Sequence, residues 1–214
     1  MRKFPSMTQP TGSLYCGPYC IIACLDVFEL LPVEPAVSLN AYNLKTQTFN
    51  GEPLVIHGQH DLITLARNIY TITGIITPGE NPKYIESTGY NSLAAMLYVL
   101  TKLGLKCEVV IRDKQTHTYL SSVFEQEFSL IKEQSVDISY LNDENLKRAQ
   151  SMLVSVISVN GALHYILNNE QGEWFDPHLK ERVQLWDPIE TWDKSDNKRD
   201  GATWLGVSIR VKNK

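Results

Sequence analysis

The sequence predicts an α+β fold in which helices come first and an antiparallel sheet follows. Apolar residues recur at helical spacing in several segments before residue 150, whereas the segments after it are short strand-like runs. The helices and strands do not alternate as βαβ units, which a parallel sheet would require. The 214 residues are 43% hydrophobic and 21% charged, an ordinary globular composition with enough chain for one substantial core. We therefore expect a single domain over residues 1–214.

Five helices are expected. The first is an almost wholly apolar run from Cys16 to Leu31, with Pro18 tolerated in its first turn and Pro32 marking its end. The second keeps the helical spacing of apolar residues behind Asp61, a suitable capping residue. Periodicity and capping residues together place the helices at 16–31, 62–70, 92–103, 124–132 and 142–150.

The strands are expected mainly after residue 150. Residues 33–56 contain Pro, Asn and Gly without a firm period, which predicts irregular chain or short strands. A strand is expected over 105–111, after Gly104 ends the preceding helix. An antiparallel meander then follows, with strands at 152–159, 163–168, 173–176, 183–186 and 204–211.

Charge and cysteine usage exclude several classes of protein. The net charge of -4 and the absence of a basic cluster argue against a nucleic-acid partner. The apolar run after Cys20 contains Asp26 and Glu29, so we expect neither a signal peptide nor a membrane span. The four cysteines do not form a paired extracellular framework. A cytoplasmic protein, or one exported without a cleaved signal peptide, fits these features; nothing in the sequence indicates an oligomeric state.

Cys16 is the candidate nucleophile. A helix N-terminus carries partial positive charge, which favours the thiolate over the thiol, and Cys16 begins the first expected helix. Gly17 is expected to let a substrate approach the backbone closely. Cys20 and Cys24 lie one and two turns deeper in the apolar helix, where a thiol is expected to pack in the core and stay protonated. Core packing is the alternative for Cys16 as well, and the sequence around it is only a modest signal.

His164 and Asp176 strengthen the assignment. Residues 161–177 predict a hairpin with the histidine on its first strand and the aspartate ending its second, so that the carboxylate orients the imidazole that activates a thiol. In an unbulged hairpin the two side chains share a face only if the turn has an odd number of residues. Asp187, which also precedes a proline, is the alternative orienting residue.

Other constellations are weaker candidates. His57 and His60 resemble a metal pair without a third ligand, and the cysteine spacing matches no common zinc or iron-sulfur site. The four tryptophans are expected in the core or in the wall of a cleft, which His178 also has the position to line. The proposed thiol chemistry implies neither a metal nor a cofactor.

Several of these motifs together resemble the papain-like cysteine peptidases of the bacteriocin-leader-processing, C39-like kind. The matching residues are Gln9, Cys16-Gly17-Pro18, the segment 92–110, His164-Tyr165 and Asp176-Pro177. The resemblance implies a papain-like fold, with an N-terminal catalytic helix packed on a C-terminal antiparallel sheet and a family-specific insertion at about 33–88. It also implies that Gln9 and the Cys16 amide form the oxyanion hole.

The combined interpretation is a thiol-dependent hydrolase, specifically a cysteine peptidase that acts on a protein or peptide through a Cys16–His164–Asp176 triad and a thioester. The same chemistry on a glutamine side chain would give a deamidase or a transglutaminase-type bacterial effector. A catalytically inactive papain-like binding module is the alternative if Cys16 is unreactive.

Overall fold

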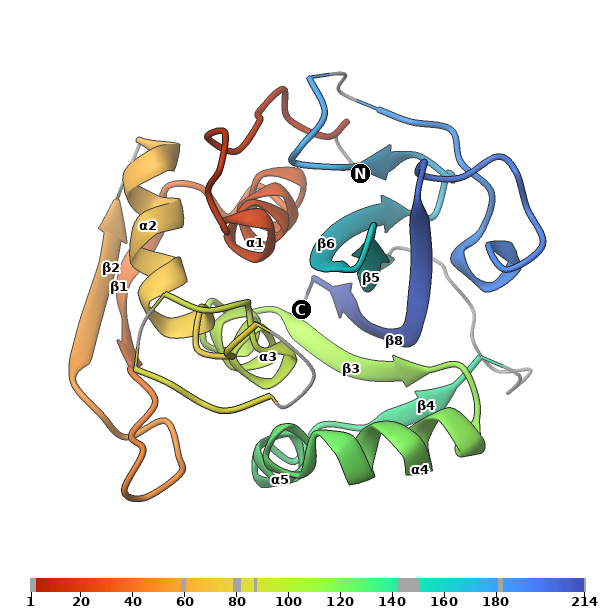
Figure 1. Cartoon of the computed structure of the whole chain (residues 1–214). Helices are drawn as coiled ribbons and strands as arrows, with labels where there is room; N and C mark the ends of the chain where they lie inside the picture. The colour runs from red at the N-terminus through yellow and green to blue at the C-terminus, as the bar shows by residue number, and fades with distance from the viewer. Residues whose placement is uncertain are drawn as a thin grey trace.

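A computed structural model describes residues 3–58, 61–78, 82–86, 88–141, 151–180 and 183–213. Within them the chain forms a six-stranded sheet, a separate two-stranded sheet and five α-helices (Figure 1). The α+β prediction is confirmed. None of the described helices is long and apolar enough to cross a membrane.

The helices are α1 (Cys16–Val27), α2 (Leu62–Thr73), α3 (Leu93–Lys102), α4 (Lys114–Val123) and α5 (Glu125–Glu133). Side chains of Asp61, Ser92 and Asp113 accept hydrogen bonds from the first turns of α2, α3 and α4, which satisfies amides left unpaired at a helix start.

The structure differs from the predicted helices in one boundary and in one additional helix. The first helix ends at Val27 rather than Leu31, because Glu29 adopts a left-handed conformation with φ of 61° and so cannot continue the helix. Helix α4 was not predicted, because Leu120 is its only buried residue and it therefore shows no apolar stripe. The helix expected at 142–150 lies outside the described residues.

The large sheet has the strand order β4-β3-β8-β5-β6-β7. Its strands are β3 (Lys106–Ile111), β4 (Ile138–Tyr140), β5 (Ser151–Val159), β6 (Ala162–Asn169), β7 (Trp174–Phe175) and β8 (Ala202–Lys212). The expected meander holds for β5, β6 and β7, but β8 returns to lie between β3 and β5, antiparallel to both. The short β4, which was not predicted, is parallel to β3. Residues 183–186 form no strand; Gln184 pairs with Trp174 in an isolated bridge.

The segment at 33–58 forms the second sheet, the hairpin of β1 (Val33–Asn40) and β2 (Pro53–Gly58). The prediction of short strands is confirmed over these ranges. Val33, Leu39 and Ile56 are buried in the same core as α1, so this hairpin packs on the rest of the molecule.

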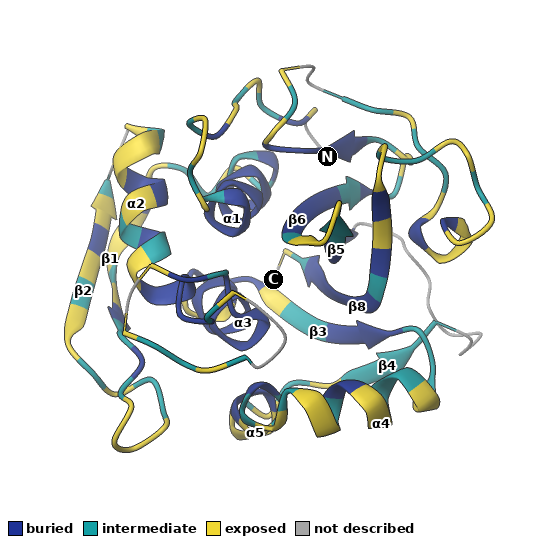
Figure 2. Ribbon diagram, in the orientation of Figure 1, coloured by how far each residue is buried: buried dark blue, intermediate teal, exposed yellow. Residues whose placement is uncertain are grey.

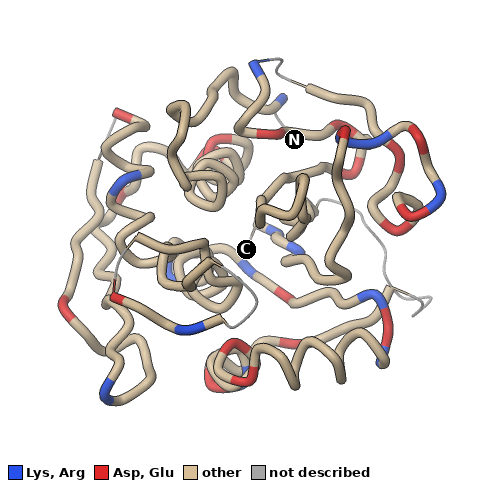
Figure 3. The backbone as a smooth tube through the Cα atoms, viewed as in Figure 1, with Lys and Arg blue, Asp and Glu red and all other residues tan. Residues whose placement is uncertain are grey.

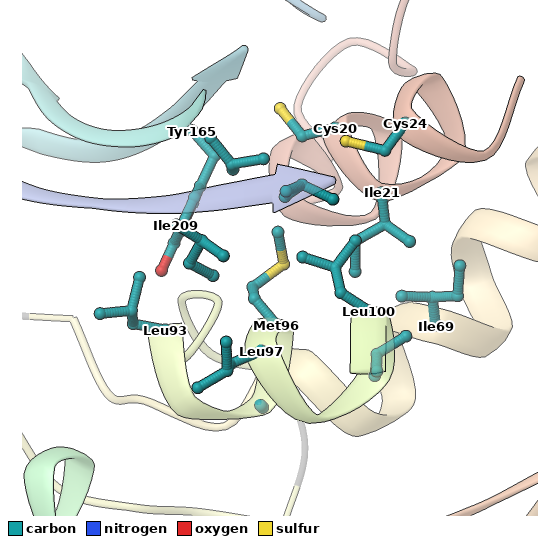
Figure 4. Close-up of a cluster of buried hydrophobic side chains, with 14 of the residues drawn as sticks. Cys20, Ile21, Cys24, Ile69, Leu93, Met96, Leu97, Leu100, Tyr165 and Ile209 are labelled. Atoms are coloured by element: carbon teal, nitrogen blue, oxygen red, sulfur yellow. The ribbon is translucent and has the colours of Figure 1, made fainter. Parts of the chain in front are cut away.

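Helix α1 lies at the centre of the core, between α2 on one side and β6 on the other (Figure 1). Every residue of α1 except Asp26 is buried, and the helix is dark blue along nearly its whole length in Figure 2. Cys20 and Cys24 join the apolar cluster between α1, α3 and β8 (Figure 4). Burial raises the pKa of both thiols well above the ordinary value, so they are core residues, as expected.

A second, smaller core contains three tryptophans. Trp174, Trp192 and Trp204 pack there with Ile157 and Ile166, whose sequence neighbours belong to the main core. Since successive side chains of a strand point to opposite faces, the two cores cover opposite faces of β5 and β6.

Candidate active site

Cys16 is the first residue of α1 and is 6% exposed. Gly17, which follows, was expected to let a substrate approach the backbone, but the structure gives another reason for a glycine at this position. A Cβ on Gly17 would lie 2.7 Å from Asn91 Cγ and 2.7 Å from Met96 Sδ, closer than side chains approach one another. Gly17 is therefore required by the packing of α1 against the start of α3.

The hairpin of β6 and β7 brings His164 and Asp176 together. Asn168 pairs with Trp174, and Asn169 donates its backbone N–H to the carbonyl of Glu173, which leaves three residues in the turn. An odd turn was the condition for a shared face, and His164 Nε2 lies 2.8 Å from Asp176 Oδ1. Both side chains are buried.

Asp176 accepts hydrogen bonds from three groups. Besides His164, the backbone N–H of His178 donates to Oδ1 at 2.8 Å and Arg199 Nε donates to Oδ2 at 2.8 Å. Burial by itself raises the pKa of this carboxyl, but the hydrogen bond and charge of His164, with smaller contributions from His178 and Arg199, lower it below the ordinary value. Asp176 is therefore a carboxylate at neutral pH.

His164 is held between that carboxylate and the thiol. Burial lowers its pKa, but hydrogen bonds with Asp176 and Cys16, together with their charges, outweigh burial and raise the pKa to about 9. Because His164 Nε2 is hydrogen-bonded to Asp176, the nitrogen that faces Cys16 is Nδ1. The arrangement favours an imidazolium paired with the negative charges of Asp176 and of the Cys16 thiolate.

His178 lies against the imidazole of His164. Its ring stacks on that of His164 with centroids 4.4 Å apart and planes 14° apart. Burial and the positive charge of His164 lower the pKa of His178, so this second imidazole stays neutral. Ligand atoms of His164, Asp176 and His178 lie within 4.8 Å of one another, a spacing that could hold a metal ion. Hydrogen bonds already use His164 Nε2 and both carboxylate oxygens of Asp176.

The other aspartate followed by proline does not contact His164. Asp187 accepts from Ser195 Oγ at 2.6 Å and from Asn197 Nδ2 at 3.0 Å, within its own surface loop. Of the weaker candidates, His57 is exposed on β2, and His60 lies outside the described residues.

Gln9 is buried, not a solvated N-terminal side chain. Its backbone N–H donates to the carbonyl of Pro177 at 2.8 Å, which fixes the N-terminal segment beside Asp176. Its Nε2 donates to the carbonyl of Ser13 at 2.8 Å, and its Oε1 has no hydrogen-bond partner among the described residues.

Sequence reasoning missed two residues of the site. Asn91, directly before the cap of α3, places Nδ2 3.6 Å from Cys16 Sγ. Arg199 lies in the loop between the short 3-10 helix η1 (Ile189–Thr191) and β8, where acidic and basic residues alternate (Figure 3). Neither residue carries a signal in the sequence, because no motif or spacing relates it to Cys16 or Asp176.

Comparison with known proteins supplies the family. The family described as "Invasion plasmid antigen J, cysteine protease" matches residues 8–214. The "Cysteine protease IpaJ" of Shigella flexneri is 25% identical over 152 residues, which cover 69% of this chain and 59% of that relative, less than two thirds of its length. No solved structure matches the chain. Since the family match extends over nearly the whole sequence, the chain belongs to the Invasion plasmid antigen J family of cysteine proteases.

Proposed function

We propose that this protein is a cysteine peptidase in which Cys16 is the nucleophile, His164 the base and Asp176 the orienting carboxylate. The observation that carries the proposal is the position of His164, which bonds Asp176 at 2.8 Å and lies near enough to the Cys16 thiol at the start of α1 for the thiol to raise its pKa. Membership of a cysteine protease family supports the same reaction.

In the resting site the Cys16 proton already lies on Nδ1 of His164, so the two groups form a thiolate–imidazolium ion pair. The thiolate then attacks the carbonyl carbon of the substrate, a C–S bond forms, and the carbonyl electron pair moves to oxygen. When the tetrahedral intermediate collapses, the C–N bond breaks and His164 returns its proton to the leaving amine. Water activated by His164 hydrolyses the thioester and restores the thiol. Asp176 keeps the imidazole in one tautomer and stabilises its charged form.

The oxyanion is assigned to the backbone N–H of Cys16 and the side chain of Gln9. Donors in this role must be fixed before the reaction, so that no reorganisation is needed when charge develops on oxygen. Gln9 meets that condition because its backbone is bonded to Pro177 and its amide is buried. One N–H of its amide is used by Ser13, which leaves the other for the oxyanion.

A thiol at a helix start facing a histidine on an antiparallel sheet supports a papain-like arrangement of the C39-like kind. We infer one papain-like domain over 1–214, with an insertion at about 33–88 that carries β1, β2 and α2. The substrate is then a protein or peptide, and the site of action is the cytoplasm or the destination of an exported effector.

The test compares the wild type with Cys16→Ala on a candidate proteome. New N-termini that appear only with the wild type are expected, because each marks a cleaved peptide bond. A mass change of about one unit on intact targets would instead indicate glutamine deamidation, and amine incorporation would indicate a transglutaminase. If both proteins bind a target equally and neither alters it, the chain is a binding module.

A further inference from the structure

We propose that Asn91 is a fourth catalytic residue, which donates a hydrogen bond to the Cys16 sulfur and stabilises its thiolate form. The inference rests on the proposed function, because it assigns a role toward the nucleophilic sulfur. Asn91 is 3% exposed, and its Nδ2 lies 3.6 Å from Cys16 Sγ, within hydrogen-bond distance for a sulfur acceptor.

The orientation of the Asn91 amide is fixed by its other partners. Nδ2 also donates to the carbonyl of Leu14 at 2.8 Å, and Oδ1 accepts from the hydroxyl of Thr73 at 2.6 Å. A carbonyl oxygen only accepts, so the flipped amide would set two acceptors against each other at Leu14. One N–H of Nδ2 therefore serves Leu14, and the other is available to the sulfur.

The amide has no freedom to move away from the sulfur. The backbone carbonyl of Asn91 accepts from the hydroxyl of Tyr165, the residue after His164. Its Cγ fits against Gly17 so closely that a Cβ there would lie at 2.7 Å. Contacts from α2, from α1 and from the chain before α1 thus fix the side chain, while β6 holds its backbone. Such prior fixation lets a donor stabilise charge without reorganisation.

The direction of the effect follows from the chemistry of sulfur. A thiolate accepts hydrogen bonds better than a thiol, and a bond to a charged acceptor is about twice as strong as a neutral one. The donor therefore favours the anion. His164 contributes the charge of the ion pair, whereas Asn91 contributes a neutral donor that does not change with pH.

Thr73 fixes the orientation of the Asn91 amide by donating a hydrogen bond to its Oδ1. It is the last residue of α2, is fully buried, and also accepts the backbone N–H of Ser92 through its carbonyl. Thr73 belongs to the segment at about 33–88 that has no counterpart in the bacteriocin-processing resemblance. In this reading the segment supports the thiol through a positioning residue.

The test measures alkylation of Cys16 by iodoacetamide against pH, read by peptide mapping, so that it does not depend on a known substrate. The wild type should label at Cys16 first and should still react near pH 6, where a free thiol is almost wholly protonated. Asn91→Ala should lower the rate at pH 6 about ten-fold, the effect of one hydrogen bond to a charged group, and move the profile to higher pH. Asn91→Asp should lower it further, because a carboxylate faces the sulfur with an acceptor.

Two further variants keep the test decisive. Thr73→Val keeps the Asn91 amide and removes only the hydroxyl that donates to its Oδ1. The labelling profile should again move to higher pH, with a rate at pH 6 about three-fold below that of the wild type. This variant tests the proposal even if Asn91→Ala unfolds. Asn43→Asp adds the same charge in the turn at 43–48 and should leave the profile unchanged. A wild type that labels Cys16 with the profile of a free thiol would overturn the proposed function as well. A wild type reactive near pH 6, with folded Asn91→Ala and Thr73→Val unshifted, would overturn the role of Asn91 alone.

Discussion

Asp176 and Asp187 are both followed by proline, yet they occupy opposite environments. Asp176 is buried, and its oxygens accept from an imidazole, a guanidinium and a backbone amide. Asp187 accepts hydrogen bonds from Ser195 and Asn197, within its own loop. The same dipeptide thus bonds a buried imidazole in one place and bonds side chains of a surface loop in the other.

The difference teaches that burial, rather than the motif, decides what an aspartate can do. A buried carboxylate interacts strongly with a neighbouring charge because little water screens it, whereas an exposed one interacts weakly. The buried cluster of Cys16, His164 and Asp176 and the surface loop around Asp187 can therefore be compared by substitutions of the same kind.

The largest contrast is expected from removal of a whole side chain. Cys16→Ala and His164→Ala should each abolish turnover, and the double variant should be no worse, because the two act as one unit. In the surface loop, Ser195→Ala should leave turnover unchanged. Turnover by purified protein, with thermal unfolding to show that each variant is folded, makes the measurement. Measurable activity in either variant of the cluster would refute the assignment.

Substitution of the two aspartates gives the next contrast. Asp176→Asn should reduce kcat roughly 10³-fold, less than loss of Cys16 or His164, because the strand itself still partly orients the imidazole. Asp187→Asn makes the same chemical change and should alter kcat less than two-fold, an estimate for a residue outside the site. Comparable losses from both substitutions would remove the distinction between the two regions.

The proximity of His164 to Asp176, and the position of Cys16 at a helix start, could be predicted because their signals are local. A helix with a cysteine at its start shows as an apolar run after Cys16, and the parity of the turn between His164 and Asp176 decides whether they share a face. The sequence alone could not exclude Asp187 as the residue that orients His164, because it does not reveal which aspartate becomes buried.

The remaining features depend on contacts between distant segments. Asn91 contacts Cys16, and Arg199 contacts Asp176, only once α3 and the loop before β8 have packed. No residue spacing in the sequence therefore indicates these contacts. The position of β8 between β3 and β5 is likewise a matter of tertiary pairing. Helix α4 was not predicted because a helix with one buried side chain shows no apolar periodicity in its sequence.

The third contrast is in stability against pH. The pKa of His164 is raised to about 9, so its contribution is fully present below its unfolded value near 6.5 and is lost as pH rises through 9. The pKa of Asp176 is lowered, so its contribution is present above its ordinary value and is lost as pH falls through the folded one. Between pH 6.5 and 9 the free energy of unfolding should fall by roughly 3 kcal/mol on account of His164.

Chemical denaturation at several pH values measures that slope. Asp176→Asn should flatten it, because the imidazole then lacks the carboxylate that raises its pKa. Asp187→Asn should not, since hydrogen bonds from Ser195 and Asn197 lower the pKa of Asp187 and its ionisation is complete well below pH 6.5. A slope that Asp176→Asn leaves intact would mean that the ion pair does not contribute to stability.

The smallest contrast concerns two arginines paired with aspartates. Arg199 bonds buried Asp176, whereas Arg112 lies 3.0 Å from Asp193 with both side chains substantially exposed. Arg199→Met should lower kcat roughly three- to ten-fold, because Asp176 loses one of its donors and orients His164 less firmly. Arg112→Met should change kcat little, as surface ion pairs contribute little.

A conservative variant separates positioning from general stability. Arg199→Lys keeps the charge but not the planar guanidinium, so kcat should recover only in part while the melting temperature returns close to that of the wild type. Because Arg199 acts through Asp176, its effect should also vanish in the background of Asp176→Asn. If Arg199→Met instead lowered the activity of Asp176→Asn by the same factor as in the wild type, Arg199 would act on the substrate or the loop directly, and the buried carboxylate would owe its orientation to His164 and the His178 amide alone.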